Sequence, residues 1–132
     1  MRKHATATFS LDSWDEKTYD EKEGAPRLAR VSSIKSYQGD IQGQGNLECL
    51  ITYRSGGAAI FVGMERVTGS VGGRSGSFVL QHIGTFEDGM AKTTLFILPG
   101  YATGDLSSIS GEGAFNVRHE PPYTMTLDYS LD

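Results

Sequence analysis

The sequence predicts an all-β protein whose strands form an eight-stranded antiparallel β-barrel. Three observations predict this fold class: apolar and polar residues alternate repeatedly, short turn motifs separate the alternating segments, and 17 of the 132 residues are glycine. A glycine inside a helix costs roughly 1 kcal/mol relative to alanine, so this many glycines disfavour a helical fold. The length suits one domain, which we expect to span residues 1–132.

The first three predicted strands cover residues 4–11, 27–37 and 40–53. In the first and third, most apolar side chains occupy odd positions, which gives each strand one apolar face. In the second, Val31 and Ile34 break strict alternation. Between the first two strands, residues 14–24 have helix-forming side chains but no apolar stripe. We therefore predict a loop there, with at most one turn of helix.

Five further predicted strands follow at short intervals, over residues 58–71, 74–86, 90–98, 109–119 and 123–131. Gly72-Gly73 and Asp88-Gly89 are typical of the tight turns that join antiparallel strands. Pro99-Gly100 and Pro121-Pro122 end the sixth and seventh strands, because proline has no backbone N–H to donate to a neighbouring strand.

A sheet of about eight twisted strands tends to curl and close, because closure removes its unpaired edges. An eight-stranded barrel has an interior that side chains can fill or that holds one small ligand. A β-sandwich is the competing architecture. A glycine inside a predicted strand marks a bend, a bulge or a close approach to the backbone. Among such positions are Gly43, Gly45, Gly63, Gly84, Gly111 and Gly113.

The charge distribution argues against nucleic acid as a partner. The formal net charge is −4, and residues 12–23 carry all of it, with six acidic and two basic side chains. The rest of the chain has no stripe of Lys and Arg, so we expect no binding to nucleic acid. The acidic segment is a solvated loop in the simplest interpretation, and a recognition site for a cationic partner in the alternative.

Composition also indicates where the protein is located and whether it binds a metal or cofactor. A single cysteine cannot form a disulfide within the chain, and no apolar run approaches the roughly 20 residues of a membrane helix. The N-terminus lacks the apolar stretch of a signal peptide, so we expect a cytoplasmic protein with no membrane contact. Three scattered histidines and one cysteine lack the spacing of metal ligands, and we expect neither a metal nor a cofactor.

Two ionisable residues, Glu65 and His82, share the apolar parity of the fourth and fifth strands with Phe61, Phe78 and Leu80. The hairpin between these strands brings both to facing positions of a central cavity. A carboxylate and an imidazole in an apolar pocket can act as a general acid–base couple, with both pKa values shifted towards neutrality. The alternative is a structural polar pair. His4, near the terminus, and His119, at a loop, lend no support to a catalytic site.

Several stretches of the chain together resemble a known bacterial family. They are FVGMERVTG at 61–69, GRSGSFVLQHIG at 73–84, PGYATGDL at 99–106, ISGEG at 109–113, SWDE at 13–16 and YTMTLDY at 123–129. The resemblance covers nearly the whole chain, and the family is domain of unknown function three-two-two-four. Its members resemble the allene oxide cyclase barrel, and the stretch at 103–111 is similar to the glycine-rich segment of allene oxide cyclases and dirigent proteins.

This resemblance implies an eight-stranded antiparallel barrel with a central cavity. Plant allene oxide cyclases and dirigent proteins guide the cyclisation or coupling of a reactive apolar intermediate largely by shape, and they form trimers. The family has no established catalytic residue that can be transferred to this chain.

Three functions remain open. The first is a barrel that binds an apolar or amphipathic small molecule inside, against Phe61, Glu65, Phe78, Leu80 and His82. The second is an isomerase or cyclase that uses the same cavity, with Glu65 and His82 as its acid–base pair. The third is a structural or interaction barrel with a filled core, whose exterior forms a homo-oligomer.

Overall fold

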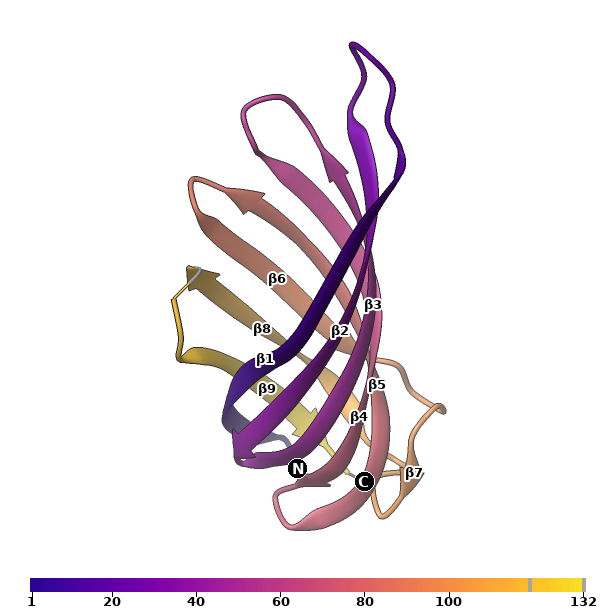
Figure 1. Cartoon of the computed structure of the whole chain (residues 1–132). Helices are drawn as coiled ribbons and strands as arrows, with labels where there is room; N and C mark the ends of the chain where they lie inside the picture. The colour runs from indigo at the N-terminus through magenta and orange to yellow at the C-terminus, as the bar shows by residue number, and fades with distance from the viewer. Residues whose placement is uncertain (119, 132) are drawn as a thin grey trace.

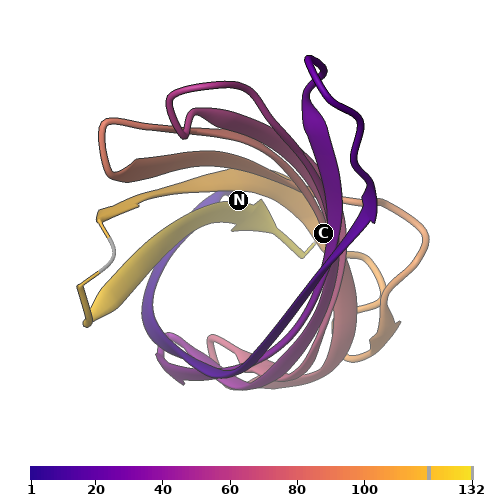
Figure 2. The ribbon, with the colours of Figure 1, turned by 45° about the horizontal axis from the view of Figure 1, so that its top comes forward.

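The computed structural model describes residues 1–118 and 120–131. Nine strands lie within these residues: β1 (Lys3–Asp20), β2 (Arg27–Gly39), β3 (Ile41–Tyr53), β4 (Ala59–Val71), β5 (Arg74–Glu87), β6 (Met90–Ile97), β7 (Thr103–Gly104), β8 (Ser110–Arg118) and β9 (Tyr123–Ser130). The eight longer strands pair antiparallel in the ring β1-β2-β3-β4-β5-β6-β8-β9, and β9 returns to β1 (Figures 1 and 2). The predicted eight-stranded barrel is confirmed, and the sandwich alternative is wrong. The short β7 pairs with the start of β5.

The predicted loop over residues 14–24 is wrong, because β1 continues to Asp20. Residues 13–20 pair with β2 and form with it the hairpin that projects at the top of Figure 1. A β-bulge between Leu11 and Ser13 shifts the register, so the alternation of the first half does not continue into the second. The second half needs no apolar face, because backbone pairing and polar contacts hold it. Tyr53, for example, donates a hydrogen bond to Glu16 over 2.7 Å.

The two ends of the barrel differ in how completely the inward-facing side chains are buried. The end that holds the chain termini is tightly packed, and Leu106 and Ile109 from the segment between β6 and β8 join its core. We call it the closed end. At the opposite end, which we call the open end, seven inward-facing residues remain partly exposed. They are Leu11, Tyr53, Phe61, Phe86, Ala91, Phe115 and Val117.

A row of glycines crosses the wall near the closed end. Gly43 on β3, Gly69 on β4 and Gly76 on β5 pair with one another in register, with φ angles of +141°, +155° and +159°. A Cβ atom on any of the three would overlap a backbone carbonyl oxygen of a neighbouring strand. The row therefore permits a bend and close strand approach that other residues would prevent.

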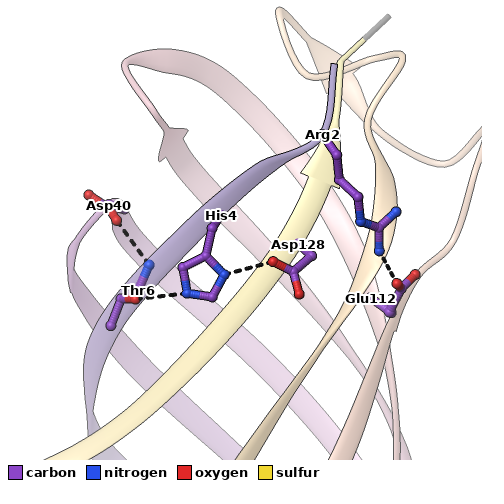
Figure 3. Close-up of polar contacts among 6 residues, drawn as sticks. All are labelled: Arg2, His4, Thr6, Asp40, Glu112 and Asp128. Carbon is purple, nitrogen blue, oxygen red and sulfur yellow. Dashed lines mark hydrogen bonds and ion pairs between the residues drawn. The ribbon is translucent and has the colours of Figure 1, made fainter.

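Polar contacts on the outer surface tie the start of the chain to β8, to β9 and to the turn between β2 and β3, around the seam where β9 meets β1 (Figure 3). His4 contacts Asp128 of β9 over 2.7 Å, and Arg2 forms an ion pair with Glu112 of β8. The carboxylate of Asp40 accepts a hydrogen bond of 2.9 Å from the backbone N–H of Thr6. Exposed pairs of this kind contribute about 0–1 kcal/mol each, so the seam depends mainly on its backbone pairing. No helix long and apolar enough to cross a lipid bilayer occurs within the described residues.

Candidate functional site

Glu65 of β4 is the centre of a buried polar cluster inside the barrel. Its Oε1 atom accepts hydrogen bonds from Lys35 Nζ over 3.3 Å and from His82 Nε2 over 2.7 Å. Its Oε2 atom accepts one from the Tyr37 hydroxyl. We call Lys35, Tyr37, Glu65 and His82 the Glu65 cluster. None of the four is more than 4% exposed, and β2, β4 and β5 supply them.

The backbone register explains how the carboxylate fits. Gly45 on β3 lies between Lys35 of β2 and Val67 of β4 in one cross-strand row. A Cβ atom at Gly45 would overlap Oε2 of Glu65. The missing side chain therefore leaves the space that the Glu65 carboxylate occupies.

The predicted site residues all face the interior, at different depths. Glu65 and His82 are in contact, but they are diagonal neighbours, because Glu65 pairs with Leu80 and His82 pairs with Gly63. Phe78 and Leu80 are buried on the side of the closed end. Phe61 lies at the open end, half-buried, with its ring over Gly84. Their roles in binding and catalysis stay predictions.

Sequence reasoning missed Lys35 and Tyr37. Both share the parity of Ala29 and Val31 on β2, and this shared parity is the signal that could have found them. The apolar Ile34 obscured it, because Ile34 in fact faces outward and is 39% exposed. Aromatic rings from two other strands complete the surroundings of the lysine. Lys35 Nζ lies 4.7 Å from the centroid of the Phe9 ring and 5.2 Å from that of Phe115.

The missed lysine also overturns the predicted pKa shifts. Burial by itself would raise the pKa of the Glu65 carboxyl, but Lys35, His82 and Tyr37 outweigh it and lower the pKa to about 2. Burial lowers the pKa of His82 below its ordinary value of 6.5, and Lys35 adds to the effect while Glu65 opposes it. Both values therefore move away from neutrality. At neutral pH the cluster contains an ionised Glu65 and a neutral His82.

The two nitrogens of the His82 ring have different environments. An ionised carboxylate only accepts hydrogen bonds, so the proton of the neutral ring is on Nε2 and is donated to Glu65. The other nitrogen, Nδ1, is then an acceptor, and it has no hydrogen-bond partner among residues 1–118 and 120–131. The Phe115 ring packs edge-on against His82 at a centroid distance of 6.0 Å. Glu65 thus orients an imidazole whose free lone pair is not used by the fold.

Acid is expected to destabilise the fold through this cluster. Between the lowered pKa of His82 and 6.5, the unfolded chain binds more protons than the folded one, so the free energy of unfolding falls as pH drops below 6.5. Between 4.5 and about 2, Glu65 adds a further loss in the same direction. Urea unfolding between about pH 7 and pH 3 measures this. The variant His82→Gln should lose the part that begins near 6.5, whereas a wild-type stability independent of pH would contradict the role given to the two residues.

Two hollows lie on the outer wall formed by the described residues, and neither is lined by the Glu65 cluster. One of about 690 Å³ lies over the glycine row and is lined by small residues such as Thr68, Ser70 and Ser75. The other, of about 210 Å³, lies over β1, β2 and β3 near Asp15 and Glu48. Within the described part of the chain, no three His, Cys, Asp or Glu side chains come together as metal ligands.

Comparison with known proteins places the chain in a family. It is similar to a protein with unknown function from the DUF3224 family of Shewanella oneidensis MR-1, known from a crystal structure. The identity is 25%, the match covers 100% of this chain and 98% of that chain, and the TM-score is 0.86. No curated protein matched the sequence.

The family model described as Protein of unknown function (DUF3224) matches residues 5–129. This match confirms the family resemblance expected from the sequence, whereas the likeness to allene oxide cyclases stays a prediction. The chain belongs to the DUF3224 family.

Proposed function

We propose that the barrel binds a small apolar or amphipathic molecule in its interior and that the molecule enters at the open end. One observation carries the proposal: the inward-facing aromatic residues towards the closed end, such as Phe78 and Tyr129, are buried, whereas several at the open end are partly exposed. Among the partly exposed residues are the aromatic rings of Phe61, Phe86 and Phe115. Apolar and aromatic lining with a few placed polar groups is typical of small-molecule sites.

The Glu65 cluster supports the amphipathic character of the ligand. It lies deeper than the partly exposed rings, between two separate groups of buried apolar residues. A molecule that enters along Phe61 and Phe115 therefore meets apolar walls first and polar groups at the end of its path. A cytoplasmic location stays a prediction from the sequence.

Adjacent residues on β6 provide a matched test. Ala91 faces inward at the open end between Phe86 and Val117, and Lys92 faces outward. Titration with the fluorescent apolar dye Nile red should show saturable binding to the wild type. The Ala91→Trp variant fills the entrance and should lower the affinity by about tenfold or more, or about 1.4 kcal/mol. The Lys92→Trp variant adds the same ring outside and should bind as the wild type does. Equal affinity in all three proteins would contradict binding inside the barrel.

A second candidate function is an isomerase or cyclase in the same interior. The observation that favours it is the orientation of His82, whose Nε2 is fixed by Glu65 while Nδ1 remains a base without a partner in the described chain. In an isomerisation, Nδ1 would take a proton from one atom of the substrate and return it to another, with Glu65 stabilising the imidazolium between the two steps. The variant His82→Gln should then abolish turnover and leave the fold intact. An unchanged rate would exclude this role.

Self-association stays a prediction, and the outer wall offers one place for it. Six large apolar side chains on β3 to β6 are each at least 40% exposed on adjoining outward positions, and this is unusual for a surface that faces only water. They are Leu50, Ile60, Val62, Met64, Ile83 and Phe96.

A further inference from the structure

Two polar atoms inside the barrel have no hydrogen-bond partner in the described chain, and they belong to neighbouring strands. One is the buried hydroxyl of Thr93 on β6. The other is the Nδ1 atom of His82 on β5, whose Nε2 contacts Glu65. His82 pairs with Leu95 and Gly84 pairs with Thr93. Thr93 is thus the diagonal neighbour of His82, one inward position nearer the open end.

Aromatic rings flank these two atoms. Phe115 of β8 pairs directly with Thr93, and its ring packs against His82. The ring of Phe61 lies over Gly84, the residue opposite Thr93 on β5. Both rings are half-buried at the open end. The unpartnered hydroxyl and imidazole nitrogen therefore lie among aromatic walls that a ligand entering the barrel would contact.

The hydrogen-bonding character of the pair selects one kind of polar group. His82 Nδ1 can only accept, because Glu65 holds the ring proton on Nε2. The Thr93 hydroxyl can donate as well as accept. A ligand hydroxyl matches both, since it can donate to Nδ1 and accept from Thr93. An ether lacks the donor, and a carboxylate lacks it too and would add a second negative charge near Glu65.

We propose that His82 and Thr93 form a hydroxyl-binding subsite, and that the ligand is a flat apolar molecule carrying a hydroxyl group between Phe61 and Phe115. The hydroxyl donates a hydrogen bond to His82 Nδ1 and accepts one from Thr93 Oγ1. This inference rests on the proposed function, because the ligand must first enter the barrel. It adds the polar group that the ligand carries and the two residues that recognise it.

A pair of probes with the same ring system tests the subsite. 2-Naphthol carries the hydroxyl, and 2-methoxynaphthalene replaces its hydrogen by a methyl group. Fluorescence titration should show that the wild type prefers 2-naphthol by about tenfold, the factor that one net hydrogen bond supplies. The variant Thr93→Val should reduce this preference several-fold and still bind 2-methoxynaphthalene. Thr94→Val is the matched control, because Thr94 is the next residue and faces outward. It should keep the wild-type preference.

The possible outcomes distinguish a failure of the His82–Thr93 subsite from a failure of interior binding. If the wild type binds both probes equally, the subsite is wrong and interior binding stands. If it binds neither probe, the proposed function is wrong and the subsite fails with it. A preference for 2-naphthol that persists in Thr93→Val would overturn the assignment of Thr93. An equal loss in Thr94→Val would overturn it as well.

Discussion

The variant Glu65→Ala is expected to lower the free energy of unfolding by about 3–5 kcal/mol, the loss seen when one partner of a buried ion pair is removed. Lys35 would remain as a buried cation without a carboxylate, and Tyr37 and His82 would each lose a hydrogen-bond acceptor. Proteins of this size are stable by about 5–15 kcal/mol, so the variant would lose a large share of its stability and unfold at a lower urea concentration.

Urea unfolding with matched controls measures this effect. Glu48 lies on the outward face of β3, where it forms an exposed ion pair with Arg30, so Glu48→Ala should cost less than about 1 kcal/mol. Removing both charges in Lys35→Met/Glu65→Leu should recover part of the loss, because no unpaired buried ion remains. A loss in Glu65→Ala no larger than that in Glu48→Ala would contradict the role given to the cluster.

The variant Gly69→Ala is expected to have an effect of similar size for a different reason. At Gly69 φ is +155°, and the added Cβ would overlap the backbone carbonyl oxygen of Gln42 on β3. The backbone conformation costs about 1–3 kcal/mol for a non-glycine residue, and forced separation of the strands costs about 1–3 kcal/mol more. We therefore expect a loss of about 3 kcal/mol or more in the same unfolding experiment.

Gly56→Ala is the control for the backbone conformation alone. Gly56 is in the turn between β3 and β4 with φ at +88°, and no atom lies within 4 Å of the position that a Cβ would take there. The free energy of unfolding of Gly56→Ala should therefore fall only by the cost of the backbone conformation, about 1–3 kcal/mol. Equal losses in the two variants would mean that close approach of the strands at the glycine row contributes nothing.

Much of the barrel could be predicted from the sequence because its strands have one buried face. The odd residues of β3 and the apolar parity of β5 directly reflect the inside of the closed sheet. The same alternation placed Glu65 and His82 inside, since they are polar residues at apolar positions. In β1 the pattern failed, because the bulge after Leu11 changes the register and the outer half of the strand is held by pairing with β2.

Alternation within single strands did not reveal every residue of the site. The register between strands decides that Lys35 reaches Glu65 across Gly45, and alternation within one strand does not contain that information. Without Lys35, burial suggests a raised pKa for Glu65, whereas the lysine lowers it to about 2. Thr93 is an ordinary strand residue in sequence, and only its buried, unpartnered hydroxyl distinguishes it. The prediction about His119 lies outside the described residues.

The most direct test of interior binding is to map bound 2-naphthol by amide chemical shifts in an NMR titration. We expect saturable shifts at Gly84, Thr93 and Phe115, which surround the inner face of the open end. We expect none at Gly43, Gly69 and Gly76, which line the outer hollow. Shifts confined to the outer glycines would contradict the proposal that the ligand binds inside the barrel.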